Sequence, residues 1–244
     1  MADTCVPGTP LIAETGGLNA MIVDSTALPE QAVRDIIVSA FQSAGQRCSA
    51  LRVLYLQEDI AEDVLTMLTG AMDLLTVGDP WDIATDIGPV IDATAKNRIN
   101  THIEAARADG RVIHQTTAPD HGHFVAPTVI RVNGIADLKE EIFGPVANVV
   151  KVKDYDEALA MANDTEFGLS SAVFTNDMRL IDRAIHELQS GLVKINAPTT
   201  GSDIHAPFGG EKASSGHAPR EQGDTAVDFF TRTRTAYIRP GAPA

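Results

Sequence analysis

The sequence predicts an α/β fold in which a mostly parallel β-sheet is covered by helices, and two features support this. Apolar runs of strand length alternate with segments of about 10–15 residues that have helical periodicity, a pattern typical of parallel sheets with helical crossovers. The chain has 244 residues, 44% of them hydrophobic, so it is long enough to bury a sizeable core. We therefore expect a layered domain and an extended C-terminal strand.

The expected elements follow one another along the chain. Residues 19–24 predict a short buried strand, and Pro29 begins a helix with apolar residues at helical spacing, which Gly45 ends. Further strands are expected at residues 50–56, 112–114, 124–132, 147–152, 171–174 and 191–196. Further helices are expected at residues 61–75, 94–108, 155–162 and 179–188. Residues 229–238 (FFTRTRTAYI) predict one extended strand.

Charge and composition exclude several classes of function. The formal net charge is -14, which argues against binding to nucleic acid or to an anionic membrane, because both would repel the chain. No apolar run approaches the roughly 18 residues needed to span a bilayer, and the N-terminus has no secretory pattern. The two cysteines, Cys5 and Cys48, fit a reducing cytoplasm, and no histidine or cysteine spacing predicts a metal site.

Cys48 is the most informative residue for chemistry. It lies between a predicted helix end and a predicted strand start, a junction at which open α/β sheets present reactive groups to a cleft. Its backbone N–H is then available to an oxyanion, and the neighbouring cation Arg47 would favour the thiolate by lowering its pKa. The alternative is a small, inert cysteine in the core.

Two carboxylates lie in turns that suit a catalytic or binding role. Glu14 precedes Gly16-Gly17, and a carboxylate in such a tight turn can act as a general base. Glu141 and Phe143 belong to the loop EIFGP, where a carboxylate can accept hydrogen bonds from ribose hydroxyls and a phenyl ring can pack beside a flat heterocycle. The alternative for both segments is an ordinary turn.

Residues 196–210 (NAPTTGSDIHAPFGG) predict a shaped loop after a strand, because the segment is rich in Gly, Pro, Ser and Thr. Gly201 and Ser202 offer an N–H and a hydroxyl to a substrate carboxylate. No Walker-type loop and no Gly-x-Gly-x-x-Gly fingerprint occurs in the sequence.

Four segments together resemble the aldehyde dehydrogenase superfamily. They are ETGG (residues 14–17), GQRC (45–48), EIFGP (141–145) and PFGG (207–210), in the family's order and at family-like separations. The resemblance extends from about residue 11 to residue 238, so we expect a non-matching segment at residues 1–10, a catalytic domain at 11–225 and an oligomerisation strand with a tail at 226–244.

The resemblance implies roles for these residues. Cys48 would attack the aldehyde to form a thiohemiacetal, NAD or NADP would accept the hydride, and Glu14 would activate the water that hydrolyses the thioester. Glu141 and Phe143 would bind the nicotinamide ribose, and Phe208 would line the substrate site. The C-terminal strand would join a neighbouring subunit of a homo-oligomer or a partner chain.

Two branches of the family are similar to different parts of the chain. Up to about residue 113, segments such as SAGQRCSALRVL resemble the pyrroline-5-carboxylate dehydrogenase module of bifunctional proline-utilisation proteins. In that branch, which oxidises glutamate semialdehyde, Ser49 would contact the substrate carboxylate. From about residue 124, segments such as HAPFGG and SSGHAPREQG resemble α-ketoglutarate semialdehyde dehydrogenases. Both likenesses predict a semialdehyde that carries a carboxylate.

The family places about two hundred residues, which bind the cofactor, before the motif that begins at Glu14, whereas only thirteen residues precede it here. We therefore expect no cofactor-binding domain and no complete reaction by the chain alone. A non-catalytic assembly module that pairs through its terminal strand is the alternative. An independent thiol hydrolase is a third possibility, but no Cys-His signature supports it.

Overall fold

The centre of the molecule is a seven-stranded β-sheet, seen in a computed structural model that describes residues 4–138, 140–216 and 220–241. Its strands are β1 (Asn19–Val23), β2 (Leu51–Gln57), β3 (Val112–Gln115), β4 (Thr128–Arg131), β5 (Val146–Val152), β7 (Ser170–Phe174) and β8 (Leu192–Ile195). Their order is β3-β4-β5-β2-β1-β7-β8, in which β3 pairs antiparallel with β4 and the other neighbours are parallel. The predicted α/β fold with a mostly parallel sheet is confirmed.

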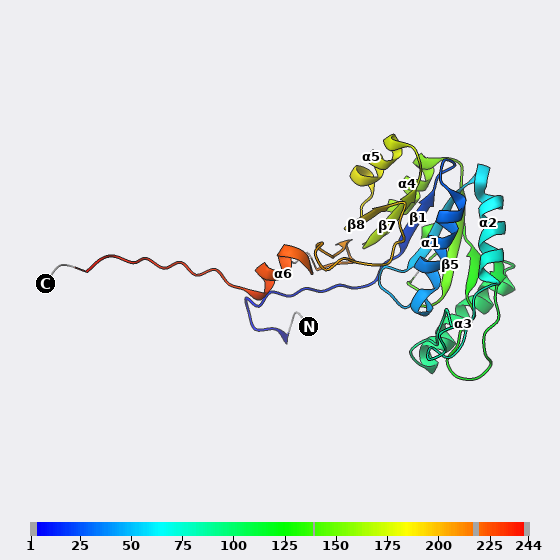
Figure 1. Ribbon diagram of the computed structural model, residues 1–244, viewed down its shortest axis with the longest axis horizontal. Helices are drawn as coiled ribbons and strands as arrows, with labels where there is room; N and C mark the ends of the chain where they lie inside the picture. Colours follow the sequence, from blue (N-terminus) through cyan, green and yellow to red (C-terminus); the bar gives the residue numbers. More distant parts are fainter. Residues whose placement is uncertain (1–3, 139, 217–219, 242–244) are drawn as a thin grey trace.

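Helices cover both faces of this sheet (Figure 1). The helices around the sheet are α1 (Pro29–Phe41), α2 (Glu58–Met72), α3 (Ala93–Ala108), α4 (Tyr155–Asn163) and α5 (Met178–Glu187), whereas α6 (Gly223–Phe230) lies apart from it. The β1-α1-β2 crossover moves across the sheet in one direction, and the β5-α4-β7 crossover moves in the other. Because such crossovers are right-handed, α1 and α4 must lie on opposite faces.

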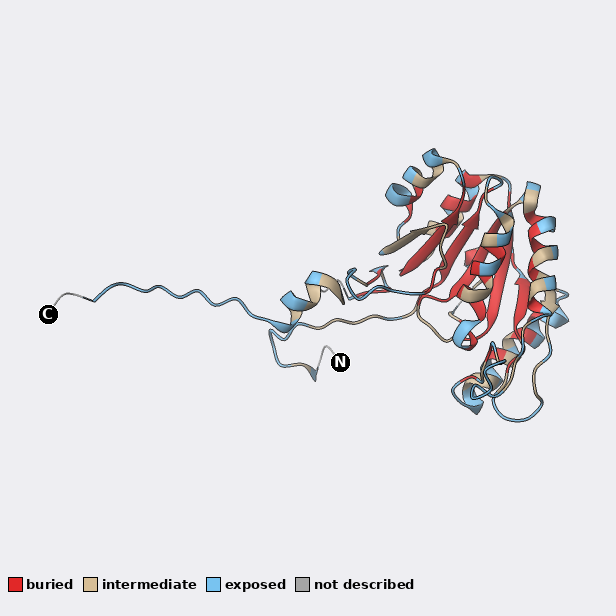
Figure 2. Ribbon diagram, in the orientation of Figure 1, coloured by how far each residue is buried: buried red, intermediate tan, exposed pale blue. Residues whose placement is uncertain are grey.

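The central strands explain why the core forms here. All five residues of β1 are buried, and six of the seven residues of β2 are buried. A strand covered by helices on both faces reads as a continuous apolar run and not as an alternating one, which is the pattern of these segments. In Figure 2 the buried residues follow the sheet and the inner sides of the helices.

The C-terminal prediction is wrong in part. Phe229 and Phe230 end α6, and residues 231–241 are exposed and belong to no strand of the described structure. Alternating polar residues do not by themselves make this segment a β-strand, because the backbone N–H and C=O groups of a strand need hydrogen-bond partners on a neighbouring strand. Figure 1 shows the segment extending away from the sheet, and α6 lies beside the N-terminal segment.

Two smaller differences concern strands. Only Thr128–Arg131 of the predicted strand 124–132 pairs with neighbours, and a short antiparallel pair, β6 (Phe167–Gly168) with β9 (Glu211–Lys212), was not predicted.

Residues 217–219 of the segment SSGHAPREQG, and residues 1–3 and 242–244 of the predicted terminal segments, lie outside the described residues. No helix in the described parts of the chain is long and apolar enough to cross a membrane.

Candidate active site

One cleft of about 570 Å³ brings together five of the residues that the sequence predicts for a site. Its lining consists of Gln46, Arg47, Cys48, Ser49, Gly201, Ser202 and Phe208. The GQRC turn and the loop after β8 are about 150 residues apart in the chain, and they meet because the loop returns from β8 to the start of β7. There Ser170 Oγ donates to the Thr199 carbonyl at 2.9 Å.

The cleft lies at the amino ends of the parallel strands. Cys48 precedes β2, its carbonyl is bound by a residue that starts β1, and Gly144 precedes β5. The predicted junction between a helix end and a strand start therefore lies at the amino edge of the sheet. What positions Cys48 is the tight connection between α1 and β2.

The turn that carries Cys48 has an unusual backbone. Ser43, Ala44 and Gly45 have positive φ values of 57°, 54° and 65°, a left-handed conformation that costs free energy for residues with a Cβ. The Asn19 side chain holds the other side of the turn, because its Nδ2 donates to the carbonyls of Cys48 at 2.7 Å and Ala50 at 2.8 Å. The strained backbone therefore persists because surrounding contacts hold the turn, among them the hydrogen bonds of the buried Asn19 amide.

The electrostatic environment of Cys48 favours the protonated thiol. Burial raises the pKa of the Cys48 thiol, and the Glu141 and Glu14 carboxylates raise it further, while the backbone N–H groups of Ser49 and Cys48 lower it. Arg47 donates from Nε to Ser43 Oγ at 3.0 Å and does not offset these effects. The pKa of Cys48 is therefore raised overall and not lowered as the sequence predicts.

Glu14 lies against the PFGG segment, half-buried. Its Oε1 accepts from Ser215 Oγ at 3.0 Å and its Oε2 accepts from the Gly210 N–H at 3.3 Å. Burial raises the pKa of Glu14 above its ordinary value, and these two hydrogen bonds lower it. A carboxyl group with a raised pKa is a better proton acceptor near neutral pH than an ordinary one. The structure does not place Glu14 in the lining of the cleft.

Glu141 and Phe143 are organised by a buried arginine. Arg52 Nε and Nη2 donate to Glu141 Oε1 at 3.1 and 2.9 Å, and the Arg52 guanidinium lies 5.4 Å from the centre of the Phe143 ring. The Gly17 N–H donates to Glu141 Oε2 at 3.1 Å. The ETGG and EIFGP segments, which the sequence predicts to act together, therefore meet at one carboxylate.

Two glycines make this assembly of motifs possible. A Cβ at Gly16 would overlap Glu141 Oε2, and a Cβ at Gly45 would overlap the Gly144 carbonyl oxygen. Only glycine permits both approaches. Each of these contacts joins two of the four sequence motifs directly.

Sequence reasoning missed Arg52, Asn19 and Ser215. Arg52 is 1% exposed and Asn19 is 3% exposed, so both are buried polar residues whose side chains bind the turns of the site. A charged residue inside the apolar run 50–56 and a polar residue at the head of a buried strand were the available signals. Nothing in the sequence alone connects Ser215 with Glu14.

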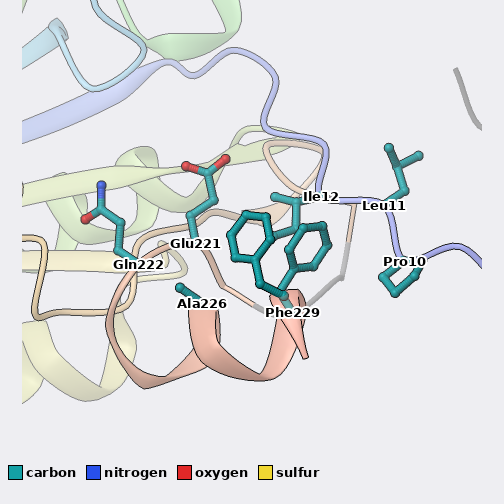
Figure 3. Close-up of a pocket in the computed structure, with 8 residues that line it drawn as sticks. Pro10, Leu11, Ile12, Glu221, Gln222, Ala226 and Phe229 are labelled. Atoms are coloured by element: carbon teal, nitrogen blue, oxygen red, sulfur yellow. The ribbon is translucent and has the colours of Figure 1, made fainter. Parts of the chain in front are cut away.

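A second pocket, of about 520 Å³, lies between residues 10–12 and α6. Figure 3 shows Ile12 beside Phe229, with Glu221 and Gln222 at one side. It contains none of the predicted site residues. Within the described residues, no group of His, Cys, Asp or Glu side chains is arranged to hold a metal ion.

Comparison with known proteins supports the resemblance of the four motifs. The chain is 46% identical over 226 residues to the bifunctional protein PutA of Klebsiella aerogenes, which covers 88% of this chain and 17% of that protein. It is 36% identical over 239 residues to the α-ketoglutarate semialdehyde dehydrogenase of Haloferax volcanii, covering 94% of this chain and 49% of that protein. Each likeness spans most of the chain, so neither is confined to one half.

Solved structures share the fold. The putative methylmalonate-semialdehyde dehydrogenase from Sinorhizobium meliloti 1021, in complex with NAD, matches 95% of this chain and 49% of its own chain, with 28% identity and a TM-score of 0.87. The chain thus spans half or less of the length of these relatives. The model of the aldehyde dehydrogenase family matches residues 2–236, and the chain therefore belongs to the aldehyde dehydrogenase family.

Proposed function

We propose that this chain is an aldehyde dehydrogenase catalytic domain that oxidises a semialdehyde bearing a carboxylate to the corresponding acid. The candidate substrates are glutamate semialdehyde, in equilibrium with pyrroline-5-carboxylate, and α-ketoglutarate semialdehyde. The observation that carries the proposal is the cleft in which Cys48 faces the same space as Ser49, Gly201 and Ser202. It combines a nucleophile with hydroxyl and N–H donors that suit a carboxylate.

The proposed chemistry begins at Cys48. The Cys48 thiol gives up its proton to solvent, the thiolate sulfur forms a bond to the aldehyde carbon as the C=O π bond breaks, and the Cys48 N–H donates to the resulting oxyanion. NAD or NADP, held in part by Glu141 and Phe143, would supply the hydride acceptor for oxidation to the thioester. Glu14 then takes a proton from water, the hydroxide adds to the thioester carbon, and the C–S bond breaks to release the acid and the thiol. The raised pKa of Glu14 supports this role.

The residues of the described chain fit one end of a dinucleotide. Glu141 Oε1 accepts from both Arg52 Nε and Arg52 Nη2, whereas Oε2 accepts only from the Gly17 N–H and retains capacity for a ribose hydroxyl. The Phe143 ring is half-buried and offers an edge or a face beside the nicotinamide. We propose that the rest of the cofactor site comes from residues outside this sequence, so residues 1–244 alone do not complete the reaction.

A first experiment tests cofactor binding by titrating NAD and NADP separately, up to millimolar concentration, into the purified 244-residue chain in a calorimeter. No heat and no thermal shift are expected. Micromolar binding, or robust NAD reduction with either semialdehyde, would show that the chain is competent by itself.

A second experiment tests the nucleophile without a cofactor. The chain is mixed with p-nitrophenyl acetate, and the acylated residue is identified by mass spectrometry. Acylation is expected at Cys48 and is expected to disappear in Cys48→Ser but to persist in Cys5→Ser. A chain whose Cys48 is never acylated would contradict the proposed mechanism.

The C-terminal segment supports a second candidate, a module for assembly. Residues 231–241 are exposed along their whole length, with Tyr237 96% and Ile238 94% exposed. An extended segment with free backbone groups can add to the sheet edge of another subunit. Sedimentation of the chain, and of a variant that ends at Phe230, tests this: a larger assembly is expected only with the segment. A monomer in both cases contradicts this candidate.

A further inference from the structure

Lys194 is a half-buried cation that the sequence motifs do not include. It lies in β8, and its Nζ donates to the Thr200 carbonyl at 2.8 Å and also to the Gly201 carbonyl. Burial lowers the pKa of Lys194, and no carboxylate of the described residues offsets that effect. A partly desolvated ammonium without an anionic partner is costly, and an anionic ligand nearby would relieve that cost.

The position of this charge relates it to the cleft. The two carbonyls that Lys194 binds lie at the start of the loop segment whose Gly201 and Ser202 line the cleft with Cys48. The ammonium therefore binds the backbone of the same loop that forms part of the cleft lining.

Of the cations near Cys48, the Arg52 guanidinium is paired with the Glu141 carboxylate. The Glu141 and Glu14 carboxylates act on the Cys48 thiol, and the whole chain has a formal net charge of -14. Arg47 is the cation in the lining itself, and its Nε is bound to Ser43. An anionic substrate that approaches Cys48 must overcome this negative field, and the Lys194 charge opposes the field at the loop.

We propose that Lys194 is a positioning residue that determines specificity: it holds the loop at Thr200 and Gly201 and gives carboxylate-bearing substrates an electrostatic preference at Cys48. This inference rests on the proposed function, because it takes Cys48 as the reacting group.

The test compares an anionic and a neutral reagent of nearly equal size at the same thiol. Iodoacetate and iodoacetamide both form an S–C bond with the Cys48 thiolate and release iodide, and neither requires a cofactor. The rate of modification at Cys48 is measured by peptide mass spectrometry in a Cys5→Ser background. In Lys194→Met the ratio of the iodoacetate rate to the iodoacetamide rate is expected to fall roughly three- to tenfold, while Lys194→Arg preserves it.

Lys212 provides a matched control. Its Nζ also donates to two carbonyls, those of Asn163 at 2.8 Å and Thr165 at 2.9 Å, and burial lowers its pKa, but neither carbonyl belongs to the loop that lines the cleft. Lys212→Met is expected to leave the ratio unchanged. Salt at about 1 M should reduce the difference in this rate ratio between wild type and Lys194→Met. Salt screens an electrostatic effect but would not reverse a change in the shape of the loop.

The outcomes separate the two proposals. If Cys48 reacts normally and the ratio is the same in wild type and Lys194→Met, the role of Lys194 is refuted and the proposed function stands. If the iodoacetamide rate changes as much as the iodoacetate rate, Lys194 only supports the shape of the loop, and the specificity role is again refuted. If wild-type Cys48 reacts with neither reagent, the proposed function fails, and this inference fails with it.

Discussion

Arg52 and Glu141 form an ion pair inside the molecule, with Arg52 Nη2 2.9 Å from Glu141 Oε1 and side chains that are 2% and 12% exposed. The same guanidinium donates to the Gly144 carbonyl and to the Arg47 carbonyl, each at 3.2 Å. One side chain of β2 therefore fixes both the EIFGP loop and the residue before Cys48. The two turns that are proposed to hold cofactor and nucleophile are coupled through it.

Replacing Arg52 by methionine is expected to destabilise the chain by about 3–5 kcal/mol, because a buried carboxylate loses its partner and two carbonyls lose a donor. The free energy of unfolding, measured with urea, checks this expectation. The rate of Cys48 thiol modification should also differ from the wild-type rate, because the turn loses the hydrogen bond that Arg52 donates to the Arg47 carbonyl.

Arg179→Met is the control for this change. Arg179 also pairs with a carboxylate, Asp177, but its side chain is 87% exposed, so its loss should reduce the free energy of unfolding far less than the loss of Arg52 does. Equal costs for the two variants would show that burial of the Arg52 pair contributes nothing.

Much of the fold is predictable from this sequence because the central strands are buried on both faces. Their residues form apolar runs bounded by turns, and the helices between them show periodic apolar positions, as for α1 with Ala32, Val33, Ile36 and Ala40 buried. The meeting of Cys48 with Gly201 and Ser202 was also predictable, since the motif order implied one site. The proposed roles of these residues remain predictions.

The remainder depends on contacts that have no local signature. Arg52 and Glu141 are 89 positions apart, and Glu14 and Ser215 are 201 positions apart, so neither pair follows from periodicity or turn chemistry. The terminal segment was misjudged because alternation predicts an extended strand only where a partner strand exists. Phe229 instead belongs to α6, which packs beside Ile12 (Figure 3).

Asn19→Ala is expected to lower the free energy of unfolding by about 2–4 kcal/mol. The Asn19 Nδ2 donates to two carbonyls, and its Oδ1 accepts from the Ser170 N–H at 3.0 Å. Denaturant unfolding measures the cost. Asn133→Ala removes an exposed amide that binds only Asp137 and should cost less than about 1 kcal/mol. A small cost at Asn19 would mean that water replaces its hydrogen bonds.

The pH dependence of Cys48 reactivity should respond to Glu14. The pKa of the thiol is raised by burial and also by the carboxylates of Glu141 and Glu14, so removal of one negative charge makes the thiolate easier to form. In Glu14→Gln the pH at half-maximal rate of iodoacetamide modification is expected to fall, because the thiol pKa is lower without this carboxylate. Glu62→Gln, at an exposed site, should not move it. A rise in Glu14→Gln would contradict the electrostatic account.

Gly45→Ala and Gly110→Ala form a matched pair that isolates the contact between two motifs. Both glycines have left-handed backbones, with φ values of 65° and 67°. A Cβ at Gly110 meets nothing within 4 Å, so Gly110→Ala should cost only the backbone strain, about 1–2 kcal/mol. A Cβ at Gly45 overlaps the Gly144 carbonyl, which must move together with the EIFGP loop.

Gly45→Ala is therefore expected to cost at least about 2 kcal/mol more than Gly110→Ala in urea unfolding, because steric overlap in a packed region adds to the backbone strain. It should also change the rate of Cys48 modification, since Gly45 belongs to the turn that carries the thiol, whereas Gly110→Ala should leave that rate unchanged. If the two variants lose the same stability, the GQRC turn does not pack against the EIFGP loop as closely as the structure shows. The link between nucleophile and proposed cofactor loop would then depend on Arg52 alone.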